Sequence, residues 1–119
     1  MKLQTLIDAI KNRPDVAQAG MILAHNGVVR GTSRDGRSVS GLKVAVDHAK
    51  LAAVLEKNRQ APGILEIQVW INENKDLSVG DDVMFLVVAG DIREHVLATM
   101  ETTLNEIKST VTSKTEYFE

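Results

Sequence analysis

The chain has 119 residues, 44% hydrophobic and 25% charged, which is enough for one domain with a buried core but too short for two. A formal net charge of -2 argues against general nucleic-acid binding, and the lack of cysteine excludes disulfides, thiolate metal sites and a cysteine nucleophile. No apolar run approaches the roughly 20 residues of a membrane span, and no secretory signal opens the chain. We therefore expect a single cytoplasmic domain over residues 1–119.

The first elements are predicted to be a helix and two strands. Apolar residues recur at helical spacing over residues 3–12, which predicts an amphipathic helix that stops near Pro14. The apolar run at 19–25 suits a buried strand. Residues 39–46 alternate with the period of two that is typical of another strand.

A stretch rich in glycine and serine joins these two strands. Its Asp35-Gly36 pair favours a tight turn, so the sequence predicts a long hairpin with residues 30–40 as a flexible hairpin tip or flap. Arg34 and Arg37 lie on this flap. Two interpretations stay open for them: a mobile flap that closes over an anion or contacts an acidic partner tail, or solvated charges at a turn.

The second half of the chain repeats the alternation of helix and strand. Residues 47–60 are rich in helix formers, and Asp47 is placed to cap the start of that helix. Residues 64–71 alternate as a strand. Residues 83–90 are almost continuously apolar, which suggests a strand buried on both faces.

A last helix is predicted over roughly residues 91–108, followed by a polar segment, 109–119, that we expect to be irregular. The inner face of that helix is predicted to be an apolar stripe of Val96, Leu97, Met100, Leu104 and Ile107. The order of elements favours an α+β fold, a two-layer sandwich with helices packed on a mostly antiparallel sheet.

Familiar catalytic motifs are absent from the sequence. His25, His48 and His95 lie far apart and none has a partner at metal-binding spacing, so we expect surface or core-edge histidines and no metal. There is no glycine-rich nucleotide loop and no Gly-x-Ser-x-Gly elbow, and we expect no cofactor.

What remains is a set of cations at the ends of elements. Arg30 follows the first strand, Arg93 lies in the first turn of the last helix, and Lys108 and Lys114 flank the polar C-terminal segment. An arginine near a helix N-terminus is unfavourable for the helix dipole, which hints at a use outside the helix. Together these groups would form a pocket for a phosphate or carboxylate. The alternative is that they are solvated charges and a helix-end cation.

Several ordered blocks of the sequence resemble the large, catalytic subunit of molybdopterin synthase. The first is Gly27-Val28-Val29-Arg30, followed by Gly36-Arg37-Ser38-Val39; the second is LSVGDDVMFLVVAG at 77–90. A long helix then ends near a lysine, and a Lys-x-Glu triplet follows it. The resemblance covers roughly residues 19–117.

The resemblance implies a function in molybdenum cofactor biosynthesis. A member of that family would convert cyclic pyranopterin monophosphate into molybdopterin, the dithiolene ligand of molybdenum. The sulfur would arrive on the thiocarboxylated Gly-Gly terminus of a small ubiquitin-like partner subunit, which fits a chain that has no cysteine of its own. The family also implies a homodimer that binds one small subunit at each far end.

Site residues follow from the resemblance position by position. Val28, Val29 and Arg30 would line the substrate pocket, with Arg30 holding the phosphate. Lys108 and Lys114 would be the catalytic residues, by binding the partner's terminal carboxyl and the pterin, and either by attacking as an amine or by moving protons. The remaining substrate-binding positions are Arg93, Thr115 and Glu116.

The chain departs from the family pattern in three places. The family's His-Arg pair at the start of the last helix reads Ile92-Arg93, its Pro-aromatic-Trp stretch reads STVTS at 109–113, and the N-terminal part begins with a helix instead of a strand. Two hypotheses therefore stay open. One is a working synthase subunit, and the other is a non-catalytic relative that keeps an anion- or partner-binding pocket.

Overall fold

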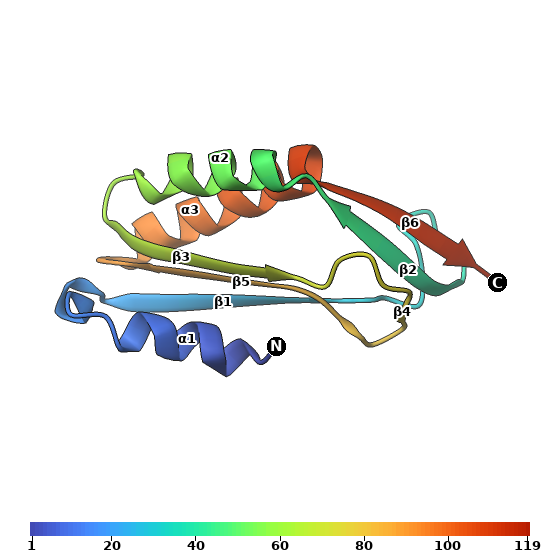
Figure 1. Ribbon diagram of the computed structural model, residues 1–119, viewed down its shortest axis with the longest axis horizontal. Helices are drawn as coiled ribbons and strands as arrows, with labels where there is room; N and C mark the ends of the chain where they lie inside the picture. The colour runs from blue at the N-terminus through green and yellow to red at the C-terminus, as the bar shows by residue number, and fades with distance from the viewer.

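The computed structural model describes residues 1–119, which form an elongated molecule of 48 × 25 × 24 Å (Figure 1). None of its helices is long and apolar enough to cross a membrane. The regular elements, in chain order, are α1 (Leu3–Lys11), the 3-10 turn η1 (Val16–Gln18), β1 (Met21–Val28), β2 (Val39–Val46), α2 (His48–Arg59), β3 (Ile64–Ile71), β4 (Leu77–Ser78), β5 (Asp82–Gly90), α3 (Arg93–Glu106), the π-helical turn η2 (Ile107–Val111) and β6 (Thr112–Phe118).

The strands form two separate three-stranded sheets in which all pairs are antiparallel. The first sheet has the order β1-β5-β3, and the second has the order β4-β2-β6. Figure 1 shows the second sheet extending from one end of the first, next to the C-terminus. The predicted α+β fold with antiparallel pairing is confirmed, with the pairing divided between two sheets.

The central strand β5 is buried on both faces, as its apolar run predicts. Its side chains alternate, so that Leu86 and Val88 belong to the larger core cluster while Phe85, Val87 and Ala89 belong to a smaller one. The larger cluster lies against α2 and α3, and the smaller one lies under α1. Continuous hydrophobicity was therefore a reliable sign that this strand has a helix on each side.

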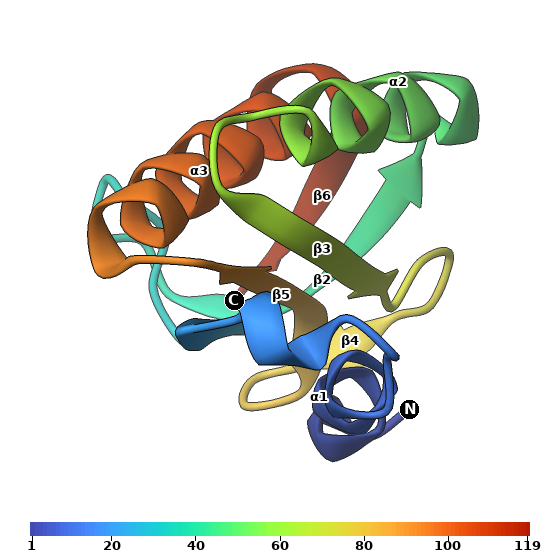
Figure 2. The same cartoon turned by 90° about the vertical axis from the view of Figure 1, so that its left-hand side faces the viewer.

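Helices cover both faces of the first sheet. Figure 2 shows α2 and α3 side by side over one face and α1 against the other. In α1, Leu6 and Ile10 are the buried residues, which matches the predicted amphipathic stripe. In α2, the side chain of Asp47 accepts a hydrogen bond of 3.0 Å from the backbone N–H of Lys50, which confirms the predicted cap.

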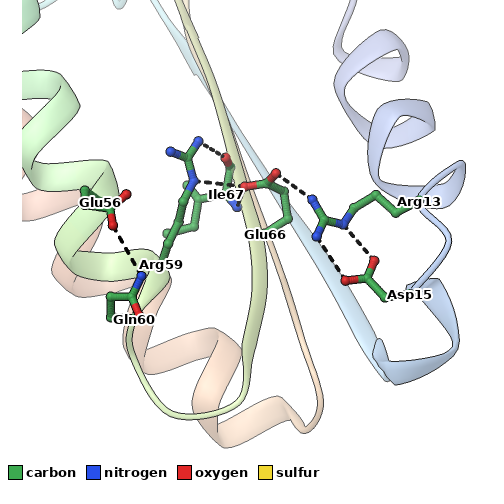
Figure 3. Close-up of polar contacts among 7 residues, drawn as sticks. All are labelled: Arg13, Asp15, Glu56, Arg59, Gln60, Glu66 and Ile67. Atoms are coloured by element: carbon green, nitrogen blue, oxygen red, sulfur yellow. Dashed lines mark hydrogen bonds and ion pairs between the residues drawn. The ribbon is translucent and has the colours of Figure 1, made fainter.

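An ion-pair network joins elements from both faces of the sheet (Figure 3). Glu66 on β3 accepts from Arg13, which follows α1, and from Arg59 at the end of α2, each at 2.9 Å. The same Arg13 pairs with Asp15, and Arg59 also donates to the backbone oxygen of Ile67. One half-buried carboxylate thus links both helical layers to an edge strand.

The predicted long hairpin between residues 19–25 and 39–46 is wrong. Strand β1 pairs along its length with β5, whereas β2 pairs with β4 and β6 in the other sheet. The tight turn itself is present: Gly36 has φ +85°, and its N–H donates to the oxygen of Ser33. The predicted turn at Asp35-Gly36 is thus confirmed, but a local turn does not determine which strands pair.

The predicted irregular segment at 109–119 is also wrong. Residues 112–118 form β6, which pairs with β2 from Val39 to Val46. Residues 112–116 are polar on both faces of the strand, so no apolar alternation marks it in the sequence. Threonine and aromatic residues suit extended backbone. The backbone hydrogen bonds to β2 supply the remaining stabilisation of this strand.

One position in the predicted stripe of α3 is wrong. Val96, Met100 and Ile107 are buried and Leu104 packs against the core, but Leu97 is 47% exposed. Thr99 and Thr103 occupy the buried face instead. At about 100° per residue, Leu97 is turned away from the line that runs through Val96 and Met100.

Candidate functional site

A cavity of about 540 Å³ lies where the two sheets meet, beneath the end of α3. It takes residues from both sheets, from the turn after α3 and from the loop between β1 and β2. They are His25, Gly27, Val28, Arg34, Leu42, Val44, Ile71, Val83, Met84, Ile107, Lys108, Thr112, Lys114 and Glu116. Apolar residues make up half of this lining. The other half includes the charged residues Arg34, Lys108, Lys114 and Glu116.

Lys108 enters the cavity from a π-helical turn. The turn spans Ile107–Val111, and the N–H of Thr112 reaches back five residues to the oxygen of Ile107. Thr110 also donates its hydroxyl to the oxygen of Glu106 at 2.7 Å, which competes with regular helical pairing. Single π turns occur often at functional sites, and here the turn brings an exposed lysine to the wall of a cavity.

Strand β6 contributes two more charged residues of the cavity by alternation. Lys114 lies opposite Val44 and Glu116 lies opposite Leu42, and all four line the cavity. Thr115 lies opposite Lys43, outside the lining. Directly paired residues share a face of a sheet, so Thr115 belongs to the outer face.

His25 lines the cavity from β1 and lies on the core side of that strand. Its Nε2 atom is buried and has no hydrogen-bond partner. Burial lowers the pKa of His25 below its ordinary 6.5, and the positive charge of Lys108 lowers it further. The ring is therefore neutral near pH 7, since both effects disfavour the charged form.

The two flap arginines have different surroundings. Arg34 lines the cavity, whereas the guanidinium of Arg37 lies 3.7 Å from the centre of the Phe118 ring on β6. This cation–π contact attaches one end of the turn to the second sheet. The anion-facing interpretation therefore suits Arg34, and Arg37 has a packing contact of its own.

Three other residues from the predicted site lie outside the cavity lining. Val29 is 2% exposed and belongs to the core, and the Nε of Arg30 donates to the backbone oxygen of Thr32 at 2.7 Å. Arg93 begins α3, whereas Lys108 follows its end, so about 20 Å of helix separates them. Its nearest ionic partner is Glu94, at 3.6 Å.

The cavity is cationic although the chain as a whole is acidic. Three positive groups, Arg34, Lys108 and Lys114, face one carboxylate, Glu116, which leaves two positive charges. The formal charge of the whole chain is -2. Lysine and arginine gathered against an apolar wall suit a ligand with an apolar body and anionic groups.

Among the lining residues that were not predicted to belong to the site are His25 and Gly27. The signal for them was present, because Leu23, His25 and Gly27 share one face of a strand by the period of two. A histidine in line with core residues is often a satisfied polar group at the edge of the core. Only the fold shows that this one has no partner.

The sequence matches the model of the MoaE protein family over residues 1–110. The chain belongs to the MoaE family. The resemblance seen in the sequence blocks is thereby confirmed, and membership gives the chain its role in molybdenum cofactor biosynthesis, as the catalytic subunit of molybdopterin synthase.

Solved structures of this family share the fold at low sequence identity. Molybdopterin synthase from Staphylococcus aureus is 20% identical, with a TM-score of 0.73, over 86% of this chain and 77% of that one. Protein E of molybdopterin cofactor biosynthesis from Burkholderia multivorans is 18% identical, with a TM-score of 0.77, over 100% and 82% of the two chains. A complex of subunits 1 and 2 of molybdopterin-converting factor from Helicobacter pylori is 17% identical, with a TM-score of 0.73, over 100% and 80%. The sequence matches no curated protein.

Proposed function

We propose that this chain transfers sulfur to cyclic pyranopterin monophosphate and so forms molybdopterin. Each of the two sulfurs of the dithiolene comes from the thiocarboxylate at the C-terminus of a small partner subunit, so two such termini are used per product and each is left as a carboxylate after hydrolysis. The observation that carries the proposal is the cavity in which Lys108 and Lys114 meet against an apolar wall. Such a cavity suits both the flat pterin and the anionic groups of the two reactants.

Lys108 and Lys114 are the proposed catalytic residues. They come from adjacent elements, and neither forms an ion pair with a carboxylate of this chain, so both charges are free for a ligand. One binds the terminal thiocarboxylate and the other binds the substrate. Two roles remain for the amines, attack on the acyl carbon or movement of protons.

The other predicted substrate-binding residues act around the cavity. Val28 forms part of its wall, and Val29 supports that wall from the core. Arg30 is exposed directly after Val29, and we assign it to the substrate phosphate, which would extend beyond the cavity lining. Glu116 lies on the same side of β6 as Lys114 and orients the substrate. Thr115, between them, lies on the outer face of β6 and acts on the substrate through the position of these two neighbours.

A homodimer and a small subunit complete the proposed enzyme. Within one copy, Arg93 lies at the end of α3 that is remote from Lys108, so it cannot reach the cavity of its own chain. Arg93 could contribute only to the cavity of a second copy. The exposed side chains of Ile92 and Leu97 beside it favour such a contact between copies. The Helicobacter pylori structure is a complex of two subunits, which supports a small ubiquitin-like partner here. A cytoplasmic location follows from this biosynthetic role.

Product formation tests the proposal. The purified chain, mixed with a thiocarboxylated small subunit from the same genome, is expected to convert cyclic pyranopterin monophosphate to molybdopterin. A chain that binds the substrate and the small subunit without forming product would support the alternative, a non-catalytic relative with an anion- or partner-binding pocket. A standard synthase assayed in parallel shows that the substrate and the conditions are sound.

Replacing Lys108 separates catalysis from stability. Lys108→Met is expected to lower turnover by about 100-fold or more, the usual scale for a lost proton-transfer group. Its stability should change by less than about 1 kcal/mol, because an exposed helix-end cation contributes little. Lys43→Met is the matched control, since Lys43 is exposed on β2 but outside the cavity lining. Equal turnover in the two variants would remove Lys108 from the mechanism.

A further inference from the structure

The three histidines of the chain have very different surroundings. His48 pairs with Glu73 at 2.8 Å and His95 pairs with Asp91 at 2.7 Å, and both pairs are open to solvent. His25 is the exception. It lines the cavity, and its buried Nε2 has no partner.

Gly27 leaves the room that this ring occupies. A Cβ added at Gly27 would lie 3.3 Å from the Nε2 of His25, so a larger residue there would press on the ring. The imidazole is thus held over the backbone of its own strand, between the core and the cavity. A buried polar atom without a partner costs about 1 to 3 kcal/mol, so its persistence calls for a use.

Charged groups from several elements line the same cavity as His25. They are Lys108 in the turn after α3, Lys114 and Glu116 on β6, and Arg34 in the loop before β2, and the charge of Lys108 acts on the His25 ring directly. These groups are mainly positive. An added proton on His25 would increase the repulsion among them, whereas a bound anion would reverse the local balance.

We propose that His25 is an anion-binding residue of this cavity, and that it takes up a proton from solvent when a phosphate-type group binds beside Lys108. The imidazolium N–H then donates to an oxygen of the anion. The only bond that forms is the second N–H bond of the imidazolium, its proton comes from the solvent or buffer, and one proton enters with each anion. The inference rests on the proposed function in one respect, because the natural anion would be the phosphate or thiocarboxylate of the reactants.

The physical consequence is coupling between anion binding and pH. Burial and the positive charge of Lys108 lower the pKa of His25 and favour the neutral ring. An anion favours the charged ring, so binding and protonation must strengthen each other by the same factor. Affinity for an anion of constant charge should therefore rise as pH falls through the range in which histidine titrates.

Sulfate is the probe, because it mimics phosphate and stays a dianion from about pH 5 to pH 8. Its dissociation constant is measured by calorimetry on the full chain at both ends of that range, at constant ionic strength. We expect sulfate to bind about tenfold more tightly at the lower pH, in the range of typical coupling between two sites. The NMR signals of the His25 ring should shift with saturating sulfate at the same time.

Two variants and one control isolate His25. His25→Gln keeps a hydrogen-bond donor but cannot take a charge, so it should bind sulfate with little dependence on pH. His25→Phe, which keeps a ring, replaces it if the Gln variant does not fold. His48→Gln should keep the wild-type pH dependence, because His48 lies outside the cavity lining.

The outcomes distinguish this inference from the proposed function. Equal pH dependence in wild type and His25→Gln would overturn it, as would absence of sulfate binding at the lower pH or unshifted His25 signals. Coupled binding without molybdopterin formation would support the role of His25 and reject sulfur transfer. Product formation without a pH dependence of sulfate binding would support sulfur transfer and reject this role of His25.

Discussion

At the scale of single residues, His25 carries a cost that most of the core avoids. Its Nε2 is buried without a hydrogen-bond partner, as is the Oγ1 of Thr103, while the core residues Leu86 and Val88 on β5 are aliphatic and fully buried. Proteins often keep such locally unfavourable groups where a ligand needs them, and they lose stability as a result. Removing the imidazole should therefore stabilise the fold and weaken the site.

His25→Phe is expected to raise the free energy of unfolding at pH 7 by about 1 to 2 kcal/mol, since it removes an unsatisfied buried nitrogen and keeps a ring. The pKa of His25 is lower in the folded protein than its ordinary 6.5, so the unfolded chain protonates first as pH falls. Wild-type stability should therefore decline below about pH 6.5, until the folded protein also takes up the proton. Urea denaturation from pH 7 to pH 5 measures both effects.

The carboxylates act in a separate pH range. Asp35 and Asp91 have pKa values below their ordinary 3.8, chiefly through hydrogen bonds from Ser33 and His95 respectively, so their contributions are lost only in stronger acid. The decline that begins near pH 6.5 should be absent in His25→Phe and present in His48→Gln. A less stable Phe variant would mean that the ring nitrogen is satisfied in solution.

At the scale of elements, turns decide how helices and strands meet. Gly63 connects α2 to β3 with φ +74°, and its oxygen accepts from the N–H of Asp91 at 2.9 Å. A Cβ at this position would overlap the side chains of Asp91 and His95. The turn therefore needs glycine for two reasons, a left-handed backbone and a close approach.

Gly63→Ala is expected to cost about 2 to 4 kcal/mol, the sum of a left-handed alanine and a displaced Asp91–His95 pair. Gly36→Ala is the matched control. Its φ of +85° is similar, but no atom lies within 4 Å of the added Cβ, so only about 1 kcal/mol should be lost. Thermal and urea unfolding of both variants give the difference. Equal losses would show that the close approach is relieved by a small movement.

At the scale of the whole molecule, two sheets and two helical layers must be held in one arrangement for the cavity to exist. The larger core cluster joins residues from both sheets, among them Leu42 and Val44 of β2 and Leu86 of β5. Away from the cavity, Glu66 links α1, β3 and α2 through its two arginines (Figure 3). Apolar burial supplies most of the stability, and this network orients the layers.

Glu66→Gln is expected to lower stability by about 1 to 3 kcal/mol, because it weakens charge-assisted hydrogen bonds to Arg13 and Arg59 at a half-buried position. Lys57→Met serves as the comparison, since it removes an exposed ion pair to Glu106 that is worth at most about 1 kcal/mol. Denaturation at low and high salt measures the loss of stability in each of the two variants. Molybdopterin formation by Glu66→Gln at a permissive temperature should match wild type, because Glu66 is outside the cavity lining.

Local patterns in the sequence were sufficient for most elements and for the family. The helix at 3–12, the cap at Asp47 and the strands at 39–46 and 64–71 all follow from periodicity and capping, which depend on neighbouring residues alone. The double burial of β5 followed from composition in the same way. The cationic residues at element ends were also visible in the sequence, and so were the blocks that resemble molybdopterin synthase.

Tertiary structure alone decided which of those residues meet. Pairing β2 with β6 and β1 with β5 depends on backbone hydrogen bonds between distant segments, and no local pattern records them. That pairing brings His25, Arg34, Lys108 and Lys114 to one cavity and leaves Arg93 at the other end of α3. Residue type can be read along the chain, but a site depends on distances in space, and these exist only after the chain has folded.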